Sequence, residues 1–271
     1  MILYKYMSLK AAEQVIANGS VGFSCLEDFN DPFECEAFNF TNAADLSLPI
    51  RVIEDAYKNN FSRKFAVLSL SKNPLNPLMW SHYGDSHFGV VLGINVDTAN
   101  LNDPETSVIP AKFGRMIYVG NKYENEISHY SITELHNIGR INSFIDSNSN
   151  LLEKAFLYKS SIWSYEEEVR IVKNIANLPF SYYLGKGRFE NWTMRDIGGR
   201  PIYCSDIPKG SIVSIFLGIN SYRCVSRREH YSDSEFVELI QSWRKHGIEI
   251  KVCDKTNHGW ELTLKDVPIR E

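Results

Sequence analysis

Runs of apolar residues and interleaved polar residues divide the chain into short strands and helices. Strand-length apolar runs occupy residues 65–71 and 89–94, and the aromatic segment Met79–Tyr83 lies between them. Because short apolar runs bounded by turn residues are typical of buried strands, residues 65–94 predict a strand, a short helix and a second strand. This unit would hold Trp, Ser, His and Tyr side chains on a rigid framework.

The pattern continues through the rest of the chain. Strands are predicted at residues 2–6, 21–24, 113–119, 166–172, 202–204, 212–217, 248–253 and 260–264, and helices at 8–18, 49–59, 132–145, 151–159 and 233–245. Strands and helices do not alternate regularly, which favours an α+β fold over a doubly wound one. We therefore expect a curved, mostly antiparallel mixed sheet with flanking helices. No linker is visible, so residues 1–271 are predicted to form a single domain.

Charge and composition narrow the classes of function. A net charge of −4 over 271 residues argues against a broad nucleic-acid or membrane surface, because such surfaces need a surplus of Lys and Arg. The chain lacks a signal peptide and a membrane-spanning run, so a cytoplasmic location and no membrane partner are expected. Its cysteines and histidines lack the usual zinc spacing, and we expect no metal. A P-loop and a Gly-x-Gly-x-x-Gly motif are also missing.

Three successive carboxylates precede a β-branched run at residues 169–172. If this segment is extended, Glu166, Glu168 and Arg170 share one face, whereas Val169 and Ile171 point to the core. One interpretation is a solvated strand end with an ion pair to Arg170 or Lys159. The other is a carboxylate that faces an aromatic cleft and stabilises positive charge at a sugar carbon. The aromatic residues of that cleft would be Tyr4, Tyr6, Trp80 and Tyr83.

The segment Phe29–Glu34 predicts a stiff loop. Pro32 disfavours helix at Asp31, and the side chains of Asn30 and Asp31 can accept hydrogen bonds from nearby backbone N–H groups. We expect a structural turn with Phe29 and Phe33 buried. Asn30→Ala should then lower thermal stability.

Five segments carry a family resemblance. They are Leu3–Tyr6, Phe29–Glu34, Ser69–Ser71, Met79–Gly89 and Tyr165–Arg170. In this order they resemble the bacterial family called domain of unknown function number twenty-nine seventy-one, across roughly residues 1–220. The order of the parts also resembles, more loosely, the DarT-like ADP-ribosyltransferases. That second resemblance implies an ADP-ribosyltransferase-like fold, NAD as the substrate and a role in bacterial conflict or phage defence.

The resemblance also implies roles for individual residues. Glu168, or Glu166, would be the catalytic acid, and the residues that bind NAD would be Tyr4, Lys5, Tyr6, Ser69, Ser71, Trp80, His82, Tyr83 and Arg170. Trp80 and Tyr83 would stack on nicotinamide, and Lys5 or Arg170 would meet the pyrophosphate. The first motif of these enzymes would correspond to Tyr4–Tyr6, and it departs from the pattern, since those enzymes usually have His or Arg where this chain has Lys5.

Two alternatives belong to other classes. One is a non-catalytic nucleotide-binding sensor or interaction module, which the unusual first motif favours. The other is a nuclease that uses His82 and Glu168. The sensor and the transferase would both bind a nucleotide. The sequence does not indicate which macromolecule would accept ADP-ribose from the transferase.

Overall fold

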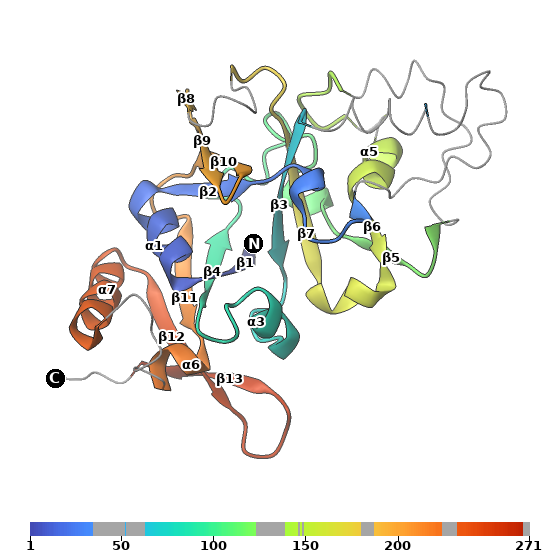
Figure 1. The fold of residues 1–271 in the computed structure, drawn as a ribbon. Coiled ribbons are helices and arrows are strands. Elements are labelled where there is room, and N and C mark those ends of the chain that lie inside the picture. Colours follow the sequence, from blue (N-terminus) through green and yellow to red (C-terminus); the bar gives the residue numbers. More distant parts are fainter. Residues whose placement is uncertain are drawn as a thin grey trace.

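The computed structural model describes residues 1–34, 52, 63–122, 139–145, 147, 149–179, 187–223 and 232–267. Its main sheet has seven strands in the order β13-β12-β11-β4-β1-β3-β7 (Figure 1). They are β1 (Ile2–Met7), β3 (Phe65–Ser71), β4 (Val90–Asn95), β7 (Glu168–Asn174), β11 (Ile212–Leu217), β12 (Glu249–Lys255) and β13 (Leu262–Asp266). Only β11 and β12 pair in parallel within this sheet. The predicted α+β class with a mixed, mostly antiparallel sheet is confirmed.

Smaller strand groups and helices surround the main sheet. A four-stranded antiparallel sheet has the order β2 (Ser20–Phe23), β10 (Arg200–Asp206), β9 (Trp192–Ile197) and β8 (Gly187–Phe189). A parallel pair joins β5 (Ile117–Val119) to β6 (Tyr158–Ser160). The helices are α1 (Leu9–Asn18), α3 (Pro77–His82), α5 (Ser149–Phe156), α6 (Ile219–Arg223) and α7 (Asp233–Lys245). Short 3-10 helices are η1 (Leu26–Asp28), η3 (Ala111–Phe113) and η6 (Ser161–Glu166).

Side-chain caps fix the ends of the helices near the sheet. The Ser8 side chain accepts a hydrogen bond from the Ala11 N–H, and Gly19 ends α1 in the left-handed conformation with φ 59°. Both ends agree with the sequence prediction. At α3 the Asn76 side chain accepts from the first backbone N–H groups, and Pro77 occupies the first helical position. The start of α3, and with it the position of its aromatic side chains, is therefore fixed locally.

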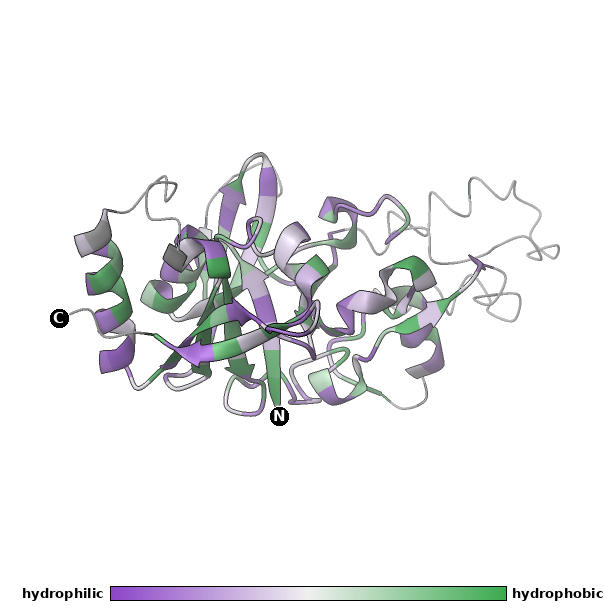
Figure 2. Ribbon diagram, turned by 90° about the horizontal axis from the view of Figure 1, so that it is seen from below, coloured by the Kyte–Doolittle hydropathy of each residue, from purple (hydrophilic) through white to green (hydrophobic). Residues whose placement is uncertain are grey.

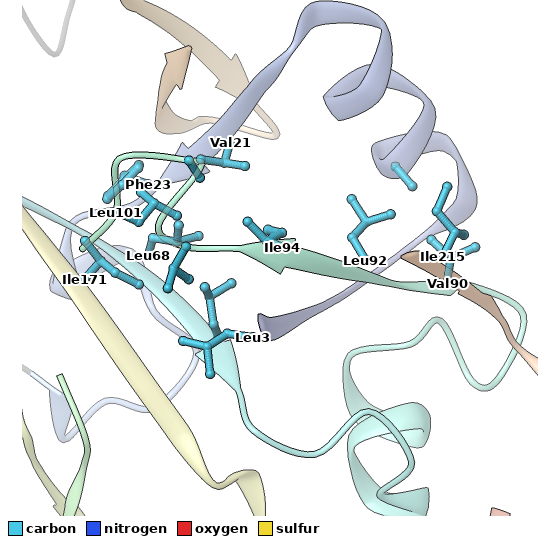
Figure 3. Packing of buried hydrophobic residues seen from close by; sticks show 14 of the residues in the cluster. Leu3, Val21, Phe23, Leu68, Val90, Leu92, Ile94, Leu101, Ile171 and Ile215 are labelled. Atoms are coloured by element: carbon cyan, nitrogen blue, oxygen red, sulfur yellow. The ribbon is translucent and has the colours of Figure 1, made fainter. Parts of the chain in front are cut away.

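Apolar side chains cover both faces of the sheet around β3. Leu68 belongs to the largest buried cluster, which also takes in Leu3 and Phe23 (Figure 3). Val67 belongs to a second cluster with Phe156 of α5. Because side chains alternate along a strand, Ser69 and Ser71 share the face of Val67. The polar end of β3 thus lies beyond an apolar core on the α5 side.

Figure 2 shows apolar residues concentrated on the central strands, with helix α7 carrying both polar and apolar positions. The apolar side of α7 contributes Phe236, Ile240 and Trp243 to the largest cluster. None of the helices in the described ranges is both long enough and apolar enough to cross a membrane.

Several element boundaries differ from the prediction. The strand predicted at 113–119 is reduced to β5, because the 3-10 helix η3 precedes it and Gly114 packs against the Arg170 backbone. The helix predicted at 151–159 ends at Phe156, and Lys159 lies on β6 instead. The last predicted strand is displaced to β13, which leaves Trp260 fully exposed before it. The helix predicted at 49–59 and most of that at 132–145 lie outside the described residues.

Candidate functional site

A cavity of about 230 Å³ lies where strands β1 and β3 separate. The two strands are in register only at Tyr4 and Ser71, and further along β3 the residue after β2, Ser24, bridges Val67 instead. Within this gap the Lys5 Nζ donates a hydrogen bond to the Ser69 carbonyl oxygen at 2.9 Å. The Lys5 side chain thus contacts the β3 backbone in the gap between the strands, and both Lys5 and Ser69 line the cavity.

Eight of the eleven predicted site residues line this cavity. They are Tyr4, Lys5, Tyr6, Ser69, Ser71, Tyr83, Glu166 and Glu168. Lys5 was expected to face away from Tyr4 and Tyr6, yet all three contribute to the lining because the cavity occupies the gap between two strands rather than one face of the sheet. The Tyr6 hydroxyl donates to the Asn73 carbonyl, so this ring is held against the loop before α3.

The other three predicted residues are not among the cavity lining. Trp80 is fully buried, and its Nε1 donates to the Pro74 carbonyl oxygen at 2.9 Å, so neither ring face is open to a ligand. His82 is exposed, with its Nδ1 3.1 Å from the Tyr165 hydroxyl. Arg170 is buried behind the carboxylates. The structure therefore does not bring Trp80 or Arg170 to the cavity wall, where the expected stacking and pyrophosphate contacts would be made.

Lys159 joins three buried carboxylates at the floor of the cavity. Its Nζ lies 3.1 Å from Glu34, 2.7 Å from Glu166 and 3.0 Å from Glu168. Lys159 donates hydrogen bonds to Glu166 and Glu168, and its contact with Glu34 is an ion pair. The opposing carboxylates raise the pKa of Lys159 although its burial acts in the other direction. Lys159 therefore remains charged and holds the three acids together.

Arg170 completes the cluster from the neighbouring strand. Its Nε donates to Glu168 at 2.9 Å, and one terminal nitrogen contacts both oxygens of Glu34 at 2.6 and 2.7 Å. The other terminal nitrogen donates to the Phe156 carbonyl oxygen, and the guanidinium lies over the Phe29 ring. With all groups ionised, three carboxylates and two cations leave this five-residue cluster with a net charge of −1.

The two carboxylates of the cavity have opposite pKa shifts. Burial opposes ionisation of Glu168, but Arg170 and Lys159 overcome it and lower the Glu168 pKa to about 2. Burial raises the pKa of Glu166, and Lys159 only partly offsets this effect. The Tyr83 hydroxyl donates to Glu166 Oε1 at 2.7 Å. Carboxyl groups whose environments separate their pKa values commonly divide the acid and base roles of a reaction.

The backbone at Glu167 explains why Glu166 and Glu168 reach one cluster. Glu166 is the last residue of η6 rather than part of the predicted strand, and β7 starts at Glu168. Glu167 between them is left-handed with φ 45°, and its exposed side chain accepts a hydrogen bond from Asn73. The chain therefore reverses locally, with both buried carboxylates on one side and Glu167 outside.

Sequence reasoning did not give Glu34 a role in the site. The turn before it is confirmed, since Asp31 Oδ1 accepts the Phe33 N–H, but Phe33 is 58% exposed and its predicted burial is wrong. The loop instead delivers Glu34 to Arg170, and Asn30 lines the cavity. Lys159 had been considered only as an ion-pair partner. Two buried cations need carboxylate partners, but the sequence does not show that Lys159 and Arg170 are buried together, so it carried no signal for Glu34.

Residues 79–171 match the model of the family described as "Protein of unknown function (DUF2971)". This stretch, called the DUF2971 region below, is similar to that family. The resemblance inferred from the sequence is thereby confirmed over that range, which contains Tyr83, Lys159, Glu166, Glu168 and Arg170. No curated protein and no solved structure matches the chain. The similarity to DarT-like enzymes and the ADP-ribosyltransferase-like fold are accordingly not confirmed.

Proposed function

We propose that the DUF2971 region and strand β1 together bind the nicotinamide-ribose end of NAD, and that the protein is an ADP-ribosyltransferase-like enzyme. The observation that carries this proposal is the pair of buried carboxylates, Glu166 and Glu168, in a cavity that tyrosines also line. The net negative charge of the cluster below them favours a positively charged ligand. Nicotinamide in NAD is a cationic ring, and a ribosyl group losing it develops positive charge.

Glu166 is the better candidate for the reacting carboxylate. Both oxygens of Glu168 are occupied by Arg170, and one of them also contacts Lys159. By contrast, Glu166 Oε1 accepts a hydrogen bond from the Tyr83 hydroxyl and from no other described residue. In its ionised form Glu166 could accept a ribose 2′-OH and offset the charge on the sugar, with Tyr83 orienting it.

The volume of the cavity limits how much of the ligand it encloses. Pockets that bury a drug-sized molecule usually measure about 300–1,000 Å³. A cavity of about 230 Å³ is smaller. It suits nicotinamide with its ribose, and the adenylate half would extend through the mouth. The acceptor and a setting in bacterial conflict or phage defence are proposed from the family resemblance alone.

A non-catalytic nucleotide sensor is the second candidate. It is favoured by the ion pairs that already neutralise Glu168, because a carboxylate held by two cations is less available to a developing positive charge. The nuclease alternative has no such support, since His82 is not part of the cavity lining that contains Glu168.

The test measures release of nicotinamide from NAD, with cell extract as the source of acceptor. Glu166→Gln keeps the size of the side chain and its bond to Tyr83, but removes the charge. We expect the rate to fall by about 10²- to 10³-fold, the usual effect of losing one electrostatic contact in a dry site.

Glu167→Gln is the matched control, because the same chemical change is made at the exposed neighbouring residue. Its rate should stay within about a few-fold of the parent. Equal rates for the parent and Glu166→Gln would exclude the catalytic role of Glu166. Binding of NAD by calorimetry without any release of nicotinamide would support the sensor.

A further inference from the structure

Lys5 occupies a different environment from the other cavity lysine. Lys159 contacts three carboxylates, whereas Lys5 Nζ donates to a neutral acceptor, the Ser69 carbonyl oxygen. A carbonyl oxygen can accept an N–H from a neutral amine as well as from an ammonium group, although the bond to the ammonium is stronger. Lys5 can therefore lose its proton without losing this hydrogen bond, and its nitrogen lone pair then becomes available within the cavity.

The surroundings shift Lys5 towards its neutral form compared with an exposed lysine. Burial lowers the pKa of Lys5, and the nearby carboxylates Glu168 and Glu166 offset only part of this effect. Lys159 and Tyr83 also line the cavity, from β6 and from the end of α3. A desolvated lysine with a lowered pKa is a nucleophile toward carbonyl carbon at neutral pH, whereas an ordinary surface lysine is almost fully protonated.

We propose that Lys5 forms an imine with a small aldehyde bound in the cavity, such as the open-chain form of a short aldose. This activity is separate from the NAD proposal, since it depends on the Lys5 amine and on no leaving group from a nucleotide. The polar lining fits a polyhydroxy aldehyde. In particular, the Ser69 hydroxyl oxygen is buried and forms no well-aligned hydrogen bond among the described residues, although it is near enough to Glu168 to help lower its pKa.

The reaction needs no oxidant or reductant. The Lys5 nitrogen attacks the carbonyl carbon, the carbonyl oxygen takes up the proton that nitrogen releases, and a carbinolamine forms. The nitrogen lone pair then forms the C=N bond as the hydroxyl leaves as water, with its proton supplied by the Glu166 carboxyl group. Deprotonation of the iminium nitrogen returns a proton to Glu166, so one aldehyde and one amine give one imine and one water. The raised pKa of Glu166 suits it to donate a proton here.

The experiment traps the imine in the full-length protein. The protein is incubated with glyceraldehyde and cyanoborohydride at pH 7.5, and peptide mass spectrometry measures the modified fraction of each lysine. Lys10 is the internal reference, because it is exposed on α1 only five residues away. We expect Lys5 to be modified several-fold more than Lys10, and to be half-maximally reactive at a pH below 10.5, the ordinary lysine value. Modification of Lys5 at or below the level of Lys10 would overturn the proposal.

Two variants separate the chemistry from folding. Lys5→Arg retains a donor for the Ser69 carbonyl but cannot form an imine, so label at this position should disappear while the melting temperature stays within a few degrees. Glu166→Gln should slow labelling of Lys5 by about tenfold or more, and leave Lys10 unchanged, because Gln cannot supply the proton. Unchanged labelling of Lys5 in Glu166→Gln would exclude the role of Glu166 as proton donor.

Discussion

At the scale of the residue, the buried cluster makes Glu168 important for stability as well as for the cavity. Glu168 accepts hydrogen bonds from Arg170 and Lys159, both largely buried. Hydrogen bonds to charged groups contribute roughly 1.5–3 kcal/mol each to folding stability. Removing one partner leaves the buried cations with too little opposing charge. Glu168→Gln should therefore lower the free energy of unfolding by about 2–3 kcal/mol, measured by urea denaturation. Glu34 and Glu166 limit the loss, since they still neutralise the cations.

The control is Glu167→Gln, whose side chain is exposed. Its unfolding free energy should stay within about 0.5 kcal/mol of the parent. Equal unfolding free energies for Glu168→Gln and the parent would show that the cluster is not coupled to folding.

The lowered pKa of Glu168 also predicts how stability changes with pH. Because the folded-state pKa of about 2 lies below the ordinary value of 4.5, the folded protein holds Glu168 ionised where the unfolded chain protonates it. This contribution is fully present above pH 4.5 and is lost as the pH falls towards 2. Glu166 acts in the opposite direction, since its raised pKa favours the folded state at low pH. In acid denaturation followed by circular dichroism, the stability of Glu168→Gln should fall less steeply with decreasing pH than the stability of the parent. Identical pH dependences would contradict the assignment.

At the scale of the element, Gly114 lets the chain after η3 pack against β7. A Cβ atom at Gly114 would lie 1.8 Å from the Arg170 carbonyl oxygen, and the Gly114 carbonyl accepts the Arg170 N–H at 2.8 Å. Gly114→Ala should thus displace one of the two backbones and lower the melting temperature by several degrees. Gly259→Ala is the matched control, since the nearest atom to its Cβ is at an ordinary 3.4 Å. Equal melting temperatures for the two variants would refute this prediction.

The strands that form the centre of the fold were predictable because their apolar runs are unambiguous. Residues 65–71 and 212–217 agree with β3 and β11. Much of the β8–β9–β10 meander was missed, because several of its side chains are exposed and its pattern is accordingly polar. The site was predicted in part, since alternation places Glu168 and Arg170 on one face. Alternation says nothing about which distant loop reaches that face, and Glu34 therefore had no sequence signal as a partner of Arg170.

At the scale of the whole molecule, the DUF2971 match does not coincide with a self-contained part of the sheet. Residues 79–171 contain β4 and the first part of β7, but β1 and β3 lie between these two strands. Both intervening strands come from the N-terminal part of the chain. A fragment of residues 79–171 should therefore expose unpaired strand edges and fail to unfold cooperatively on heating.

The full chain is the reference in this experiment, and near-ultraviolet circular dichroism reports the packing of its aromatic residues. A cooperative thermal transition in the isolated fragment would show that β4 and β7 can pair with other segments.

The contact between Glu34 and Arg170 also has a consequence for synthesis of the protein. The two residues are 136 positions apart in sequence, and Lys159, Glu166 and Glu168 all lie near the later of them. A nascent chain emerging from the ribosome therefore carries Glu34 for a further 136 residues before Arg170 is synthesised. Closure of so long a loop is slow, so the cavity is completed late in folding. Any reaction that it supports is consequently withheld from partly translated chains.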